Sequence, residues 1–216
     1  MTDLHVVTHA NKDLYEDVLD EYFRLRHKIY VDERRWMELA KPDGREIDQF
    51  DTPDTVYLMA IDGRRVVGSH RLVPTIKPTL MSDLFPQLAI RGLIRRPDAY
   101  ELSRVFVIRE RRGEQAQPRV ESVIMAGTME YALAQGISQF TIVMETWWLP
   151  RFQDLGWRLR PLGLPTMING MNCIGVVADV NEEIWVETCM RRSVPGSVLV
   201  WNGLEPAMPE PRVAAG

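Results

Sequence analysis

The sequence predicts an α/β fold in which helices flank one mixed, twisted sheet. Short apolar runs of strand character alternate with segments whose apolar residues recur at helical spacing. Their order is strand, helix, hairpin, strand, helix, strand, helix, strand, which is typical of a sheet with helices packed on its faces. We expect one domain over residues 1–204 and a frayed tail over 205–216, which contains three prolines.

The first third of the chain predicts a strand, a long helix and a loop. The strand is expected over residues 5–8, and Asn11 is a candidate cap for the helix that follows. Helical spacing continues to about Arg34 through five apolar residues, namely Leu14, Val18, Tyr22, Leu25 and Ile29. Residues 36–53 are polar and show no period, so we expect a loop of the kind that carries function.

The remaining elements follow from turn residues and apolar runs. Two strand-like runs meet across an Asp-Gly turn at Gly63, which predicts a hairpin. Pro118 opens a long helix that ends at Gly136. The other expected elements are a short helix over 81–85, a strand from Glu101, a strand over 140–145, a Pro-interrupted helix over 147–157, a strand over 172–180 and a helix over 182–192.

Composition excludes several classes of protein. The formal net charge of −4 and the pI near 5.6 argue against a general nucleic-acid binder, whose surface would be basic. The only two cysteines, Cys173 and Cys189, are too few for a zinc site or a disulfide framework. No run approaches the roughly 20 apolar residues of a membrane span, and the start lacks the features of a secretion signal. We therefore expect a cytoplasmic protein that requires neither a metal nor a membrane.

Charged residues recur in apolar, strand-like contexts through the first half of the chain. Burying such groups is costly unless they are paired or bind something, so their recurrence indicates a ligand. Other roles remain open for several of them. Asp48 and Asp51 could lie in a solvated loop, Arg71 and Glu101 could form an ion pair, and Trp36 could be a core residue. The set comprises Arg26, Trp36, Asp48 and Asp51 in GREIDQFD, Arg71 in GSHRLVPT, and Glu101 and Arg104 in YELSR.

As a set, these residues resemble the acyl-homoserine-lactone synthases, the autoinducer synthases of bacterial quorum sensing. The resemblance covers roughly residues 20–160 and implies a fold related to the GCN5-type (GNAT) N-acetyltransferases. Tyr30 stands where the family pattern has its first Phe, and its added hydroxyl needs a partner. The matching positions are Arg26, Trp36, Asp48, Phe50, Asp51, Arg71, Phe85, Glu101, Ser103 and Arg104.

The resemblance implies that S-adenosylmethionine is acylated on its amine from a thioester and then closed to a lactone, with release of methylthioadenosine. S-adenosylmethionine and the acyl thioester would both be substrates, and no prosthetic group is implied. Glu101 is the candidate base, with Arg104 and Asp48 as further catalytic residues, and peptide N–H groups after Arg104 would stabilise the oxyanion. The residues expected to bind S-adenosylmethionine are Arg26, Tyr30, Trp36, Asp48, Asp51, Arg71 and Arg104.

The acyl group is expected to lie against the strand over 140–145 and the two tryptophans after it. Large, rigid Trp side chains would shorten an acyl tunnel, as in the subgroup that takes branched or aryl groups from coenzyme A. The modest acidity of the chain also disfavours an acidic acyl carrier protein as donor, although arginines in RRGEQAQPR could meet a carrier phosphate. The expected acyl-pocket residues are Ser103, Phe106, Thr141, Met144, Trp147 and Trp148.

Two other functions remain open: an ordinary N-acyltransferase that uses acyl-CoA and a different amine, and a non-catalytic sensor of a thioester or S-adenosylmethionine. A geometric expectation accompanies the site. Glu101 and Arg104 are an odd number of residues apart, so a regular strand would point them to opposite faces. If both face one site, the strand must be distorted between Glu101 and Phe106.

Overall fold

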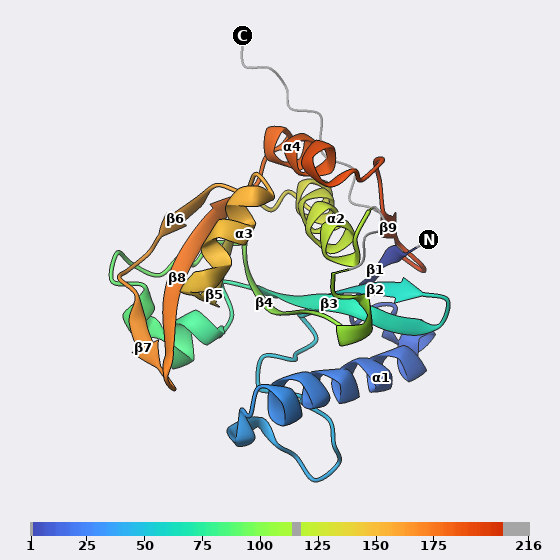
Figure 1. Ribbon diagram of the computed structural model, residues 1–216, viewed down its shortest axis with the longest axis horizontal. Coiled ribbons are helices and arrows are strands. Elements are labelled where there is room, and N and C mark those ends of the chain that lie inside the picture. The colour runs from blue at the N-terminus through green and yellow to red at the C-terminus, as the bar shows by residue number, and fades with distance from the viewer. Residues whose placement is uncertain (1, 114–117, 205–216) are drawn as a thin grey trace.

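A computed structural model describes residues 2–113 and 118–204, which contain one mixed sheet with the order β6-β8-β5-β4-β3-β2-β1-β9 and β7 beside β8 (Figure 1). Neighbouring strands are antiparallel except for β1 with β9 and β4 with β5. The strands are β1 (Asp3–Val7), β2 (Val56–Asp62), β3 (Arg65–Pro74), β4 (Ala99–Val107), β5 (Gln139–Glu145), β6 (Leu159–Pro161), β7 (Thr166–Ile168), β8 (Met171–Asp179) and β9 (Leu199–Val200).

Helices cover both faces of the sheet, as the sequence predicts. The helix α1 (Glu16–Arg26) lies on one face of the central strands, and α2 (Val120–Ala134) lies on the other with α4 (Glu182–Arg192) outside it (Figure 1). Most side chains of α2 are buried because it is enclosed between the sheet and α4. The short helix α3 (Leu149–Asp154) follows β5. In the described part of the chain, no helix is both long enough and apolar enough to cross a membrane.

Short helical segments connect these elements. Two of them have π-helical hydrogen bonding: η2 (His27–Glu33), which continues α1, and η4 (Leu80–Leu84). The 3-10 segments are η1 (Lys12–Tyr15), η3 (Met37–Leu39), η5 (Pro86–Leu88), η6 (Arg109–Arg111) and η7 (Thr146–Trp148). The loop from Ala40 to Thr55 has no regular structure, in agreement with its aperiodic sequence.

One local expectation is wrong, and three short strands were not expected. Asn11 does not cap the first helix with its side chain; the amide instead accepts a bond from Thr8 N and donates to the carbonyls of Val6 and Asn202, which ties the two ends of the described chain together. The sequence pattern does not predict β6, β7 and β9. These strands have only two or three residues, too few to show a period.

The expected distortion of β4 is confirmed. Ser69 pairs with Phe106 but Arg71 pairs with Ser103, so β4 has one extra residue and Arg104 and Val105 together oppose His70. Arg104 has a left-handed backbone (φ 55°), a conformation that costs a non-glycine residue about 1–3 kcal/mol. This bulge turns Arg104 toward the face that carries Ser103, two residues beyond Glu101.

The strands β4 and β5 pair only at their beginnings. Four residue pairs join them, from Ala99 with Gln139 to Leu102 with Ile142, and beyond this point the two strands separate. The peptide groups of β4 after Leu102 therefore have no partner on the β5 side. This opening in the middle of the sheet is where a ligand can reach the backbone of both strands.

The packing of η5 on β8 generates a stability prediction. An alanine methyl at Gly175 would lie 2.6 Å from the Leu88 carbonyl oxygen, a backbone atom that cannot rotate away. We expect Gly175→Ala to destabilise the fold by about 1–3 kcal/mol, which lowers Tm by several degrees. Thermal unfolding followed by circular dichroism measures this, with Asn172→Ala on the exposed part of the same strand as control. An unchanged Tm for Gly175→Ala would contradict the close packing.

Candidate active site

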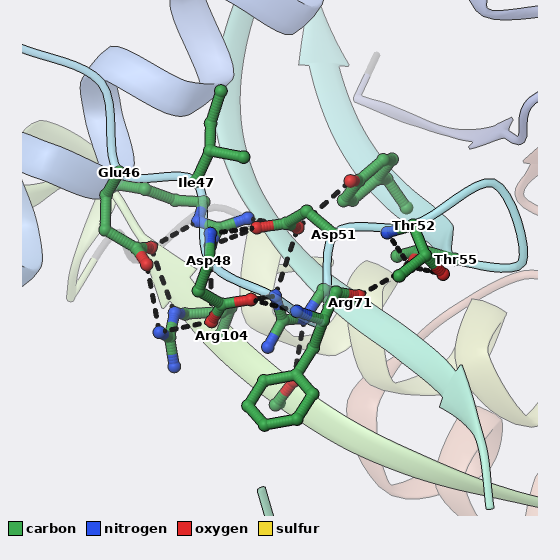
Figure 2. A network of polar contacts seen from close by, with 12 residues as sticks. Glu46, Ile47, Asp48, Asp51, Thr52, Thr55, Arg71 and Arg104 are labelled. Atoms are coloured by element: carbon green, nitrogen blue, oxygen red, sulfur yellow. Dashed lines mark hydrogen bonds and ion pairs between the residues drawn. The ribbon is translucent and has the colours of Figure 1, made fainter. Parts of the chain in front are cut away.

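Five charged residues that the sequence singles out converge with Glu46 into one buried network (Figure 2). Its cations come from the end of α1, from β3 and from the bulge of β4, and its carboxylates come from the loop between η3 and β2. The members are Arg26, Arg71 and Arg104 with Glu46, Asp48 and Asp51. None of the six side chains is more than 8% exposed, so the network is part of the interior.

Arg26 forms the base of the network. Its Nε donates to Glu46 at 2.6 Å, and its two terminal nitrogens donate to the two oxygens of Asp51 at 2.8 and 3.0 Å. The Tyr57 hydroxyl also donates to Asp51, at 3.0 Å. Because every polar atom of the guanidinium is directed at a carboxylate, the conformation of the loop is fixed relative to α1.

Arg71 and Arg104 hold Asp48 between them. Arg71 Nη1 donates to Asp48 at 2.6 Å and lies 3.0 Å from Asp51, while its Nε donates to the Ser103 hydroxyl at 3.2 Å. Arg104 donates to both oxygens of Glu46 at 3.0 Å and to Asp48 at 2.8 Å. The strained backbone at the bulge thus allows one arginine to contact two carboxylates.

Three positive and three negative charges balance in the network. Burial opposes the charge on Glu46, but hydrogen bonds and ion pairs with Arg104 and Arg26 outweigh it and lower the pKa of this carboxyl to about 2. In the same way, Arg26 and Arg71 outweigh burial and hold the pKa of Asp51 below its usual range. Burial also raises the pKa of the Tyr30 phenol to about 12. The Glu46 and Asp51 carboxylates therefore stay charged at neutral pH.

Sequence reasoning missed Glu46. The residue stands two positions before Asp48 in GREIDQFD. Three arginines and two aspartates leave one positive charge without a partner, which points to a third carboxylate. The sequence does not show which acidic residue lies close enough to supply it. Its backbone N–H donates to the Phe23 carbonyl at 3.0 Å, so both its backbone and its side chain anchor the loop to α1.

A cavity of about 440 Å³ opens where β4 and β5 separate. Its lining combines polar residues with apolar ones. The polar residues include Arg34, Asp48, Ser103, Arg104 and Glu145, with the rings of Tyr30 and Trp36 beside them; the apolar residues include Leu102, Met125, Ile142, Met144, Trp148, Phe152 and Leu155. A cavity of this size and lining suits a small ligand with one charged and one apolar end.

The structure divides the residues expected to bind S-adenosylmethionine into two groups. Four of them line the cavity: Tyr30, Trp36, Asp48 and Arg104. The remaining three do not, because their charged groups are used in the network behind Asp48: Arg26, Asp51 and Arg71. The expected hydroxyl partner of Tyr30 is the Val105 carbonyl in the β4 bulge, at 3.2 Å.

The Glu101 carboxylate lies outside the cavity lining, away from the position that a direct base would occupy. It is 1% exposed, does not line the cavity, and accepts bonds from the backbone N–H groups of Leu80 and Met81, both at 2.8 Å. Burial raises the pKa of its carboxyl although these donors oppose the shift. The carboxylate instead fixes the first turn of η4, whose Leu80 and Leu84 form part of the cavity wall.

The structure places three of the expected acyl-pocket residues at the cavity wall. Ser103, Met144 and Trp148 line the cavity, but three other expected residues do not. Phe106 stacks on Tyr22 in the core, because the bulge turns it toward α1. Thr141 is buried where β5 still pairs with β4. Trp147 is 46% exposed and stacks on the outer face of the Trp148 ring, at 4.6 Å between centroids.

The carrier-phosphate hypothesis concerns RRGEQAQPR, of which residues 114–117 lie outside the described residues. Over the two described ranges, no group of His, Cys, Asp or Glu side chains is arranged to hold a metal ion.

Comparisons with known proteins agree on one family. The model of a family described as autoinducer synthase matches residues 10–187. The isovaleryl-homoserine lactone synthase of Bradyrhizobium diazoefficiens is 48% identical over 181 residues, which cover 83% of this chain and 81% of that protein.

Solved structures show the same relationship. BjaI, a CoA-dependent acyl-homoserine lactone synthase solved with SAM and isopentyl-CoA, superposes with a TM-score of 0.90 and 44% identity over 95% of each chain. At the level of the fold alone, an acyl-CoA N-acyltransferase from Pseudomonas aeruginosa matches with a TM-score of 0.59 and 17% identity, covering 82% of this chain and 99% of that one. The expected acetyltransferase-like fold is thus confirmed.

The lowered pKa of Glu46 generates a prediction for stability against pH. A folded-state pKa of about 2, below the ordinary value of 4.5, gives stability that is present above pH 4.5 and lost as the pH falls toward 2. The difference corresponds to about 3 kcal/mol. We expect Glu46→Gln to destabilise the protein at pH 7 by about 3–5 kcal/mol, because Arg26 and Arg104 lose a buried partner.

Urea unfolding at pH 7, 5, 4 and 3 measures both effects. The wild type should lose stability steeply below pH 4.5, and the variant should lose less over the same range. Asp54→Asn, which breaks an exposed ion pair with Lys77, is the control and should change stability by less than about 1 kcal/mol. Similar pH dependence in wild type and Glu46→Gln would refute the assigned role of Glu46.

Proposed function

Because this chain belongs to the autoinducer synthase family, we propose that it is an acyltransferase that makes an N-acyl-L-homoserine lactone from S-adenosylmethionine and an acyl-CoA. The observation that carries the proposal is the cavity at the separation of β4 and β5. Its wall combines charged and aromatic residues with apolar ones, which matches an amino-acid-like acceptor and an acyl donor. Both substrates would meet at the unpaired backbone of β4.

The polar part of the cavity lining suits S-adenosylmethionine. That molecule carries a sulfonium cation, an amine and a carboxylate, so it needs both signs of charge at fixed positions. Asp48 supplies a carboxylate and Arg104 a guanidinium at the cavity wall, each held in place by the network behind it. Trp36 and Tyr30 stack with centroids 5.3 Å apart and add aromatic surface to the cavity wall.

The acylation step follows from these positions. The amine attacks the thioester carbonyl, the carbon–sulfur bond to coenzyme A breaks, and the amine proton is lost as the thiolate leaves. An α-amino group has a pKa near 8, so a useful fraction is neutral at pH 7 without a strong base. Peptide N–H groups of β4 beyond Leu102, which lack a β5 partner, are available for the developing oxyanion.

Lactone closure then needs only positioning. The carboxylate of the acylated intermediate attacks its own γ-carbon, the bond from that carbon to sulfur breaks, and methylthioadenosine leaves as a neutral thioether. Attack by an anion on a carbon next to a cation neutralises both charges, so an apolar cavity favours the step. Arg104, fixed by Glu46 and Asp48, would hold the carboxylate in the direction of attack.

A short, branched acyl-CoA is the proposed donor. Met144, Trp148 and Phe152 bring large side chains to the apolar part of the lining, where they limit the length of a straight chain. The names of the isovaleryl-homoserine lactone synthase and of the BjaI complex support the same donor class. An aryl-CoA and an acyl carrier protein remain alternatives to be tested against it.

Purified protein incubated with S-adenosylmethionine and a thioester panel tests this function. We expect methylthioadenosine, free thiol and acyl-homoserine lactone, with kcat/KM for isovaleryl-CoA at least about tenfold above octanoyl-CoA and octanoyl carrier protein. Trp148→Ala should narrow that ratio, whereas Trp201→Ala, which removes an indole stacked on Tyr131, should leave it unchanged. Free thiol without methylthioadenosine would indicate another amine acceptor and overturn the proposal.

Glu101→Gln tests whether this residue positions η4 or acts as a base. A Gln side chain has one acceptor oxygen and cannot serve both backbone donors, so we expect kcat/KM for both substrates to fall about tenfold. The pH dependence of kcat/KM should keep the same midpoints. Asp83→Asn, exposed on η4, is the control. Selective loss of the acid limb of the profile would instead identify Glu101 as the base.

A further inference from the structure

A series of aromatic rings and charged groups runs along the wall of the cavity. We call it the aromatic–ionic belt. It begins on α3, passes the end of β5, and ends beside η3. Its members are Arg151, Trp148, Trp147, Glu145, Arg34 and Trp36.

The acyl side of the belt is a stack of two indoles under a cation. The Arg151 guanidinium carbon lies 5.1 Å from the ring centroid of Trp147 and 5.2 Å from that of Trp148. The outer ring, Trp147, donates its indole N–H to the Glu145 carboxylate. The position of the cavity-lining Trp148 ring therefore depends on Glu145 through Trp147.

The other side of the belt leads to the polar network. The Arg34 guanidinium carbon lies 5.2 Å from the ring centroid of Trp36, which stacks on Tyr30. Arg104 in turn lies over the Tyr30 ring, at 5.2 Å. The Trp36 ring thus stands between Arg34 and the group of residues proposed to hold S-adenosylmethionine.

One ion pair joins the two sides. Arg34 Nη1 lies 2.5 Å from Glu145 Oε1, although the residues are 111 positions apart, one at the end of η2 and the other at the end of β5. The side chains are only 31% and 15% exposed, and both line the cavity. Of the two Glu145 oxygens, one accepts from Arg34 and the other from Trp147.

We propose that Arg34 and Glu145 are a positioning pair that makes the choice of acyl group and the binding of S-adenosylmethionine depend on each other. This inference rests on the proposed function. Loss of either charge releases both aromatic walls at once: Trp147 and Trp148 on the acyl side, and Trp36 on the acceptor side. Since the amine and the thioester must meet at close range, joint control of the two walls limits reaction to donors that fit.

The test uses Arg34→Gln, Glu145→Gln and the double variant, assayed with isovaleryl-CoA and octanoyl-CoA. Each single variant should lower the isovaleryl preference about three- to tenfold and raise KM for S-adenosylmethionine by a similar factor. Because the two residues act as one unit, the double variant should show no larger effect than either single variant. The charge-reversed pair, Arg34→Glu with Glu145→Arg, should recover neither, because an arginine cannot accept the Trp147 N–H and a carboxylate cannot replace the cation over the Trp36 ring.

Controls separate positioning from folding. Arg158→Gln with Glu183→Gln removes an exposed ion pair outside the cavity lining and should change neither readout. Thermal unfolding is measured for every variant, and Arg34→Met, which keeps much of the side-chain length but not the charge, replaces Arg34→Gln if the latter fails to fold.

Distinct outcomes identify which idea fails. Multiplicative effects of the two single variants, or equal losses with both donors and an unchanged KM for S-adenosylmethionine, would overturn the coupling. If wild-type protein makes no acyl-homoserine lactone with any donor, the proposed function fails independently of the variants.

Discussion

The ion pairing of six buried charges is the constraint on which the rest of this structure depends. A guanidinium or carboxylate taken out of water is tolerated only when its partners are present, and loss of one partner leaves an uncompensated charge. Arg26, Arg71 and Arg104 come from three elements that regular structure already places side by side. The loop between η3 and β2 has no such support, and its three carboxylates are what hold it against the sheet.

The bulge in β4 is a second consequence of the same network. A regular strand would direct Arg104 away from the face of Ser103, and the arginine could not reach Glu46 and Asp48. The left-handed backbone at Arg104 costs free energy, which its three hydrogen bonds to carboxylates offset. The same bulge leaves the Val105 carbonyl unpaired within the sheet, and the Tyr30 hydroxyl satisfies it.

The arrangement separates residues that build the site from residues that can touch a substrate. Arg26, Glu46, Asp51 and Arg71 lie behind the cavity and fix the positions of Asp48 and Arg104. Glu101 has a comparable role on the other edge of the site, because it fixes η4 through two peptide groups. Some charged residues that stand out in the sequence thus cannot touch a substrate. Only those whose side chains line the cavity can do so.

Much of the fold followed from the sequence alone. Apolar residues at helical spacing predicted α1 and α2, and apolar runs bounded by turn residues predicted the central strands. The odd separation of Glu101 and Arg104 even required the bulge. The sequence pattern also identified most of the polar network. Strands of two or three residues could not be predicted, because so short a run has no period and forms only where a neighbouring edge is free.

Only the tertiary structure decided how the site residues are used. Glu46 and the link between Arg34 and Glu145 depend on segments far apart in the chain, and no local pattern indicates that they meet. The displacement of Phe106 and Thr141 from the cavity depends on the bulge and on how far β4 and β5 stay paired. Residue types and their spacing determined which charged and aromatic groups are available for a site. Long-range packing decided which of their atoms face the cavity, because the exposure of a side chain to the cavity depends on the assembled sheet.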